Sequence, residues 1–199
     1  MALFTEQQIR ARFESEKRAR NSRGYRYFSA TEALNEGRIT DSTQQYDIFL
    51  SHSSKDMELI AGLKLILEDL GYKVYVDWND DSLNPNIVTP ETAKILRERM
   101  KQCKSLIYAF SENASNSKWM PWELGYFDAL KDSRVAVLPI SKSAEHAYKG
   151  SEFVGVYYFV QFDKIINSNK DAIWVHNNDD YIIYDSWLKG QKPYKHTMQ

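Results

Sequence analysis

The sequence predicts an α/β fold in which a mostly parallel sheet carries helices on both faces. Short apolar runs rich in strand formers alternate with segments whose apolar residues recur at helical spacing. Such alternation is typical of parallel strands joined by crossover helices, and near-continuous apolar runs fit strands buried on both faces. A chain of 199 residues with 43% hydrophobic residues is long enough to bury one core of this kind.

Five strands are expected in the main part of the chain. They cover residues 46–51, 73–78, 105–110, 134–140 and 156–160. Beyond them, residues 172–176 and 181–184 are expected to form a hairpin around a polar turn. Trp187 and Leu188 are then expected to pack a last helical turn on the body of the protein.

Capping signals mark the helices between the strands. After the first strand, Ser53 and Asp56 have the spacing of a capping box, and Gly71 is the expected C-cap of the same helix. Thr89 is expected to cap the next helix. Cys103 continues the apolar stripe of that helix, which indicates a core residue rather than a nucleophile.

The chain is expected to form one main domain with two additions. Residues 1–44 are predicted as a helical extension and linker, residues 45–165 as the α/β domain, and residues 166–199 as a hairpin and helical turn packed on it. The N-terminal helix has a thin apolar stripe, Ile9 and Phe13, among many charges. We therefore expect it to dock lightly on the domain and to keep a solvated basic face.

Composition disfavours several classes of protein. The 26 Lys and Arg residues nearly balance the 27 Asp and Glu residues, so no global basic field indicates nucleic-acid binding. A single cysteine cannot form an internal disulfide or a site built from cysteines. The N-terminal residues become charged too early for a signal peptide, and no apolar run approaches the roughly 20 residues that cross a bilayer. A cytoplasmic protein without membrane contact is the expectation.

Residues 117–130, SKWMPWELGYFDAL, are the most unusual stretch of the chain. Trp119 and Glu123 are four residues apart and share one face of a helix, and Tyr126 falls on the same side. Apolar walls raise the cost of a carboxylate charge, so such a group usually has a partner or a task. The alternative is a core helix in which Glu123 meets a surface cation.

The expected topology places this helix at a ligand-binding edge. Open parallel sheets bind ligands beyond the carboxyl ends of their strands, where the strand order reverses. If the order is the flavodoxin-like 2-1-3-4-5, that point lies between strands one and three. Ser51, His52 and Ser53 leave strand one, and the helix with Glu123 follows strand three. His52 could bind a ligand there or simply bond to neighbouring backbone.

Several cofactor and metal signatures are missing from the sequence. There is no P-loop and no G-x-G-x-x-G motif, which disfavours a kinase, an ATPase or a dehydrogenase. No cluster of His, Cys, Asp or Glu has the spacing of metal ligands. Ser51 or Ser53 acting as a nucleophile would need a base, and nothing in the sequence places one. We expect neither a metal nor a bound cofactor.

Three motifs resemble a bacterial TIR (Toll/interleukin-1 receptor) domain between roughly Tyr46 and Val160. They are YDIFLSHSSKD, KVYVDW before a long loop, and the W-x-x-x-E of WMPWE. The resemblance implies a flavodoxin-like five-stranded sheet of order 2-1-3-4-5, cleavage of NAD⁺ by Glu123 and a pocket lined by Trp119. It also implies self-association through the loop from Asn79 to Thr89. This loop lacks the Arg-Asp-Pro-Gly-type sequence of receptor TIR domains, which argues against receptor-style adaptor contacts.

The resemblance extends to anti-phage defence of the Thoeris type. TIR proteins of that system make a cyclic or modified ADP-ribose signal, which a separate effector protein detects. NAD⁺ would then be the substrate rather than a cofactor. Asp77 and Trp78 at the end of strand two, with Tyr126, are further expected wall residues, and amides near Ser53 could hold a phosphate.

One carboxylate can suffice for this chemistry. Ordinary glycoside hydrolysis uses two because the leaving oxygen must be protonated, whereas nicotinamide leaves a pyridinium as a neutral base. What remains is an oxocarbenium-like transition state, which a carboxylate stabilises. Two alternatives stay open: a non-catalytic scaffold that binds like domains through the loop, and a related fold that acts on nucleosides, such as a deoxyribosyltransferase.

Overall fold

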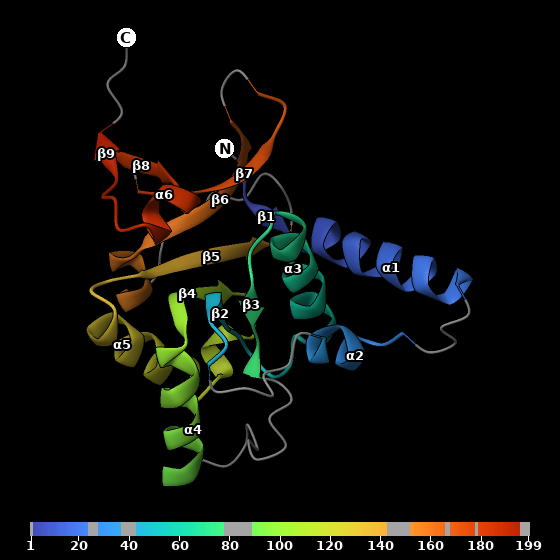
Figure 1. The fold of residues 1–199 in the computed structure, drawn as a ribbon, viewed down its shortest axis with the longest axis horizontal. Coiled ribbons are helices and arrows are strands. Elements are labelled where there is room, and N and C mark those ends of the chain that lie inside the picture. Colours follow the sequence, from blue (N-terminus) through green and yellow to red (C-terminus); the bar gives the residue numbers. More distant parts are fainter. Residues whose placement is uncertain are drawn as a thin grey trace.

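Five parallel strands form the centre of the protein, seen here in a computed structural model (Figure 1). They are β2 (Tyr46–Ser51), β3 (Val74–Tyr75), β4 (Cys103–Phe110), β5 (Val135–Ser141) and β6 (Tyr158–Lys164). Their order is β3-β2-β4-β5-β6, which is the flavodoxin-like order expected from the sequence. The structure describes residues 2–23, 28–36, 43–77, 89–142, 152–165, 168–177 and 179–195.

The sheet is wider than the five strands that the sequence predicted. Within the described residues it has nine strands, because β7 (Asp171–His176), β8 (Asp180–Ile183) and β9 (Tyr194–Lys195) continue it antiparallel from β6. The expected hairpin is therefore present as β7 and β8, and it extends the main sheet. In addition, β1 (Phe4–Thr5) pairs with the end of β5, where Phe4 lies opposite Ile140.

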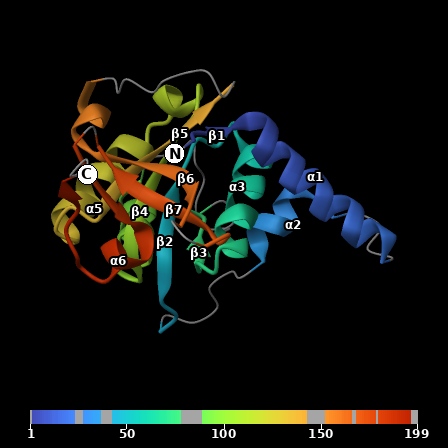
Figure 2. The same cartoon turned by 90° about the horizontal axis from the view of Figure 1, so that it is seen from above.

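Helices cover both faces of the sheet, as the turned view in Figure 2 shows. One face carries α1 (Glu6–Ser22), α2 (Ala30–Asn35) and α3 (Met57–Asp69), and the other carries α4 (Pro90–Lys101) and α5 (Met120–Leu130). The side chains of β4 point alternately into two hydrophobic cores. Ile107 and Ala109 belong to the first core, on the side of α1, α2 and α3, and Leu106 and Tyr108 belong to the second core, on the side of α4 and α5. No helix of the described segments is long and apolar enough to span a membrane.

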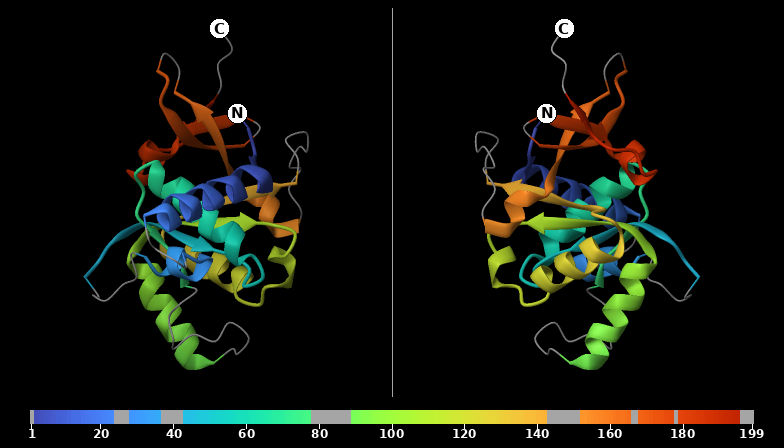
Figure 3. Two further views of the ribbon diagram at one scale, coloured as in Figure 1. Left: turned by 90° about the vertical axis from the view of Figure 1, so that its right-hand side faces the viewer. Right: turned by 90° about the vertical axis from the view of Figure 1, so that its left-hand side faces the viewer.

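The N-terminal helix packs more closely than its thin apolar stripe predicted. Ile9 and Phe13 are buried in the first core, and α1 runs alongside α3 (Figure 3). Gly62 of α3 allows this approach, because a Cβ atom there would lie 2.3 Å from the backbone oxygen of Ile9. The expectation of light docking is therefore wrong: the missing side chain on α3, rather than extra apolar residues on α1, brings the helices together.

Most of the predicted helix boundaries agree with the structure. The Thr89 side chain accepts a hydrogen bond from the Thr92 amide and caps α4, and Gly71 follows α3 with a φ of +96°. Ser117 Oγ accepts from the Met120 amide at the start of α5. The predicted capping box of Ser53 and Asp56 is wrong, because the Asp56 carboxylate makes no cap and points to another loop.

The C-terminal helix, α6 (Tyr184–Leu188), lies at the amino ends of β2 and β4. The Tyr184 hydroxyl is 2.7 Å from Ser105 Oγ, which donates to the Asp47 carbonyl. Tyr184 and Trp187 are fully buried in the first core, so the predicted packing of Trp187 is confirmed. The candidate site lies at the opposite end of the sheet, at the carboxyl ends of the parallel strands.

Candidate functional site

Glu123 and Ser51 meet at the carboxyl edge of the central strands. Ser51 is the last residue of β2, and Glu123 lies in the first turn of α5, which follows β4. Ser51 Oγ donates a hydrogen bond of 2.6 Å to Glu123 Oε2, and the Glu123 residue is only 2% exposed. The end of β2 and the start of α5 therefore meet, as the position of the switch point predicts. The carboxylate meets a hydroxyl rather than the surface cation of the alternative interpretation.

The surroundings of Glu123 raise the pKa of its carboxyl group. The pKa rises from its ordinary 4.5 to about 8; burial is the larger cause and the negative charge of Asp77 the smaller one. The hydrogen bond from Ser51 lowers the pKa and offsets part of the rise. A buried carboxyl group near a second carboxylate commonly behaves in this way. Glu123 can consequently exchange a proton near neutral pH, which is a common property of acids at functional sites.

His52 and Asp77 lie beside this pair, just beyond the ends of the neighbouring strands β2 and β3. His52 Nδ1 is 3.0 Å from the Leu50 carbonyl oxygen and 3.6 Å from Asp77 Oδ1. The contact with Leu50 is the backbone bond that the sequence allowed as one of two roles for His52. Asp77 follows β3 and is a quarter exposed, so its carboxylate reaches the same edge from the strand next to β2.

Ser53 accepts two hydrogen bonds within the turn that follows β2. Its hydroxyl accepts from the Lys55 amide at 3.4 Å, and its carbonyl accepts from the Asp56 amide at 3.0 Å. Ser53 is buried next to the start of α3. The amides of Lys55 and Asp56 are thus bonded within the turn, and the phosphate contact expected near Ser53 stays a prediction.

Aromatic side chains flank Glu123 on both sides along α5. Trp119 is 8% exposed and packs edge-on against Trp122, with ring centroids 5.4 Å apart. Trp122 stacks on Tyr126 at 5.6 Å, and the Arg97 guanidinium of α4 lies 6.0 Å from the Trp122 ring. Tyr126 thus contacts Trp122, and its expected role as a wall residue on the side of Glu123 stays a prediction.

Not every predicted site residue can be placed. Trp78 and residues 79–88 of the long loop lie outside the described residues. Cys103 is buried in the second core, and burial raises the pKa of its thiol, so its interpretation as a core residue is confirmed. Among the residues that the structure describes, no three His, Cys, Asp or Glu side chains are grouped so that they could hold a metal ion.

Asp56 contacts Ser111 and Asn113, a connection that no local pattern in the sequence predicts. Both residues follow β4, and both donate hydrogen bonds to the Asp56 carboxylate at the start of α3. In the sequence, Asp56 has the spacing of a capping box with Ser53, which favours a local role for its carboxylate. The available signal was a carboxylate after one strand and a run of polar side chains after its neighbour.

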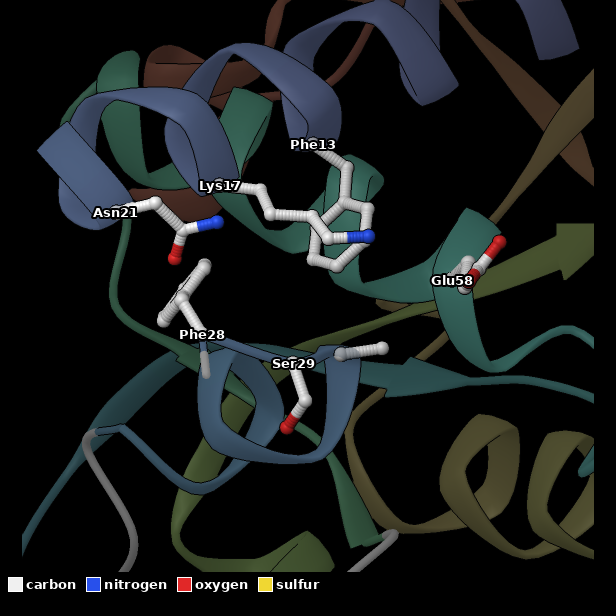
Figure 4. Close-up of a pocket in the computed structure, with 7 residues that line it drawn as sticks. Phe13, Lys17, Asn21, Phe28, Ser29 and Glu58 are labelled. Atoms are coloured by element: carbon white, nitrogen blue, oxygen red, sulfur yellow. The ribbon is translucent and has the colours of Figure 1, made fainter. Parts of the chain in front are cut away.

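A separate groove lies on the other face of the sheet (Figure 4). Its volume is about 340 Å³, and it is bounded by α1, the start of α2 and the start of α3. Phe13 and Phe28 supply its apolar wall, and Lys17 and Glu58 lie at its sides. Since these helices pack on the face opposite α5, this groove is distinct from the site around Glu123.

Comparison with known proteins identifies the family of this chain. The TIR domain family matches residues 48–173. A protein of Bacillus cereus strain MSX-D12, named as a probable 3′ cyclic ADP-D-ribose synthase, ThsB′, is 51% identical over 152 residues, which cover 75% of this chain and 78% of the relative. A Cytobacillus dafuensis protein with the provisional name cyclic ADP-D-ribose synthase TIR2 is 34% identical over 83 residues, which cover 41% of this chain and 22% of that protein.

The family match begins at Ile48 within β2, includes β3, β4, β5 and β6, and covers both partners of the pair formed by Ser51 and Glu123. It ends at Ile173 within β7. From its sequence and its fold, the chain belongs to the TIR domain family.

Proposed function

We propose that this protein cleaves the bond between nicotinamide and ribose in NAD⁺ and releases ADP-ribose or a cyclic or modified ADP-ribose. The observation that carries the proposal is the buried Glu123 carboxyl, hydrogen-bonded to Ser51 at the carboxyl edge of the sheet. The two relatives named as cyclic ADP-D-ribose synthases support it. NAD⁺ is the substrate, and the reaction requires no further cofactor.

Glu123 stabilises the cation that forms as nicotinamide departs. The leaving base is neutral, so no acid has to protonate it, and positive charge develops on the ribose. A carboxylate in a site shielded from water interacts with that charge more strongly than it would in water. The pyridinium of bound NAD⁺ favours the ionised form of Glu123, which counters the raised pKa caused by burial and Asp77.

The other residues shape the site. Trp119 forms an aromatic wall, and its buried Nε1 has no hydrogen-bond partner among the described residues, so it can donate to an oxygen of the substrate. The amides near Ser53 bind a phosphate, and Asp77 with His52 closes the side next to β3. Trp78 and Tyr126 are the remaining wall residues in this proposal.

The fate of the ribosyl cation decides the product. Attack by water gives ADP-ribose and releases a proton. Attack by a group of the same molecule gives a cyclic product, which contains one water fewer. The resemblance to Thoeris proteins favours a product that acts as a signal for a separate effector in anti-phage defence. Copies of the protein assemble through the loop of residues 79–89, which completes the site.

Mass spectrometry of the reaction mixture tests this proposal. Purified protein is incubated with NAD⁺ at high protein concentration, with and without a crowding agent that promotes assembly. We expect loss of NAD⁺, an equal amount of free nicotinamide, and a product with the mass of ADP-ribose or of ADP-ribose less one water. NAD⁺ that stays intact in both conditions would contradict the enzymatic proposal and would favour the non-catalytic scaffold.

A further inference from the structure

Asp56 occupies the capping position of α3 but does not cap the helix. An aspartate at this position commonly accepts a hydrogen bond from an amide of the first helical turn, yet the Asp56 side chain makes no such bond. Its Oδ2 accepts from Ser111 Oγ, and its Oδ1 accepts from Asn113 Nδ2 at 2.6 Å. Both partners are more than fifty residues away in sequence, so the carboxylate forms a tertiary contact.

The three residues form a cluster, which we call the Asp56 clasp (Asp56, Ser111 and Asn113). Asp56 and Ser111 are buried, and each Asp56 oxygen has its own donor. A carboxylate is rarely buried without such partners, because loss of hydration is costly. Ser111 Oγ also accepts from the Asn113 amide at 3.2 Å, which fixes the loop against itself.

The clasp joins the two loops that carry the candidate site. One loop begins at Ser51 and ends at Asp56, where the Asp56 amide bonds to the Ser53 carbonyl. The other begins at Ser111, passes the short 3-10 helix Ala114–Asn116 and leads into α5 with Glu123. Asp56 is five residues from Ser51, and Asn113 is ten residues from Glu123, so each half of the clasp belongs to the same connection as one partner of the pair.

We propose that Asp56 is a positioning residue that holds these two loops together and so sets the hydrogen bond between Ser51 and Glu123. Asp56 acts through the loops and does not touch the substrate. The inference rests on the proposed function only for its kinetic consequence, because the geometry of Ser51 and Glu123 can be measured without any reaction. Small misplacements of catalytic groups are costly for reaction rates.

Two substitutions at Asp56 separate this role from simple packing. Asp56→Ala removes both acceptors and leaves the Ser111 and Asn113 donors without their partner. Asp56→Asn keeps the shape, and a serine hydroxyl can turn to accept from the new amide while the remaining oxygen still accepts from Asn113. The alanine variant should therefore open the clasp, and the asparagine variant should largely preserve it. Glu58→Ala is the control, since Glu58 is an exposed carboxylate two residues along the same chain.

The kinetic experiment measures kcat and KM for NAD⁺ with wild type, both Asp56 variants and Glu58→Ala. We expect Asp56→Ala to lower kcat by about tenfold to a hundredfold with little change in KM, Asp56→Asn to recover most of that loss, and Glu58→Ala to match wild type. Equal losses in Asp56→Ala and Asp56→Asn would overturn the proposal, and so would an unchanged kcat in Asp56→Ala.

Crystal structures of wild type and Asp56→Ala give a readout that does not depend on activity. We expect the 2.6 Å contact between Ser51 Oγ and Glu123 Oε2 to be lost in the variant; an intact contact would overturn the proposal. If Asp56→Ala does not fold, Ser111→Ala and Asn113→Ala take its place, with the same two readouts. A lost contact in a protein whose wild type leaves NAD⁺ intact would support the clasp and contradict the proposed function.

Discussion

Three parts of the structure determine the environment of the Glu123 side chain. The first turn of α5 supplies its position, Ser51 at the end of β2 supplies a hydrogen-bond donor, and Asp77 supplies a repelling charge. The result is a carboxyl group whose pKa lies near 8 instead of at its ordinary 4.5. Two predictions at this residue follow from that value.

The first concerns activity. Glu123 must be ionised to stabilise a cation, so we expect kcat/KM for NAD⁺ to rise with pH and to reach half its maximum near the free-enzyme pKa of about 8. The profile of kcat should have a lower midpoint, because the pyridinium of bound NAD⁺ favours the carboxylate. Initial rates from about pH 6 to about pH 10 measure both. A kcat/KM that falls across this range would contradict an ionised Glu123.

The second concerns stability. The folded pKa of Glu123, about 8, is higher than its ordinary 4.5, so the folded state favours the protonated form. That stabilisation is complete below pH 4.5 and is lost as pH rises through about 8. We therefore expect Glu123→Gln to be more stable than wild type at alkaline pH, and the advantage to shrink toward acid pH. Melting temperatures measured across this range provide the test; a constant difference would contradict the raised pKa.

Trp119 contributes to the core as well as to the proposed pocket. It is mostly buried and packs against Trp122 in the second core, so Trp119→Ala should lower the free energy of unfolding by about 3 kcal/mol or more. Trp119→Phe keeps an aromatic ring but removes Nε1, and we expect a smaller loss of stability with a clear loss of turnover. Denaturant unfolding and NAD⁺ assays on both variants measure this. An unchanged stability in Trp119→Ala would place the indole outside the core.

At the scale of elements, two helical glycines allow a matched comparison. A Cβ atom on Gly62 would lie 2.3 Å from the Ile9 backbone oxygen, whereas a Cβ atom on Gly125 would have no neighbour within 4 Å. Gly62→Ala should therefore separate α1 from α3 and cost about 1–3 kcal/mol. Gly125→Ala should be neutral or stabilising by up to about 1 kcal/mol, because alanine favours the helix.

Denaturant unfolding of the two glycine variants measures the difference. Equal stability of Gly62→Ala and Gly125→Ala would show that α1 does not depend on close contact with α3. The close approach at Gly62 also explains why the sequence of α1 alone predicts only light docking. Its own sequence shows only Ile9 and Phe13 as apolar anchors, and the space that receives Ile9 is created by a residue on another helix.

At the scale of the whole molecule, the first core links both ends of the described chain. It contains Phe4 and Ile9 near the start and Tyr184 and Trp187 near the end. We therefore expect Trp187→Ala to lower the stability of the entire chain by about 3–5 kcal/mol. Circular dichroism and tryptophan fluorescence should report a single unfolding transition at a shared, lower midpoint. A separate early transition for the C-terminal segment would contradict this coupling.

The parallel sheet and the place of Glu123 could be predicted because both depend on local patterns. Apolar runs mark β2 and β4, and the switch-point rule then brings Ser51 near α5. The Asp56 clasp could not be predicted in this way, since a local capping pattern and a distant hydrogen bond compete for the same carboxylate. The pairing of Phe4 with Ile140 likewise depends on residues far apart in sequence.

The most direct test of the central claim compares nicotinamide release from NAD⁺ by wild type and by Glu123→Gln under the same assembling conditions. Glutamine preserves the shape of the side chain but carries no charge, and melting curves confirm that both proteins are folded. We predict release by wild type and a loss of at least about a hundredfold in the variant. Equal release by the two proteins would contradict the role given to Glu123.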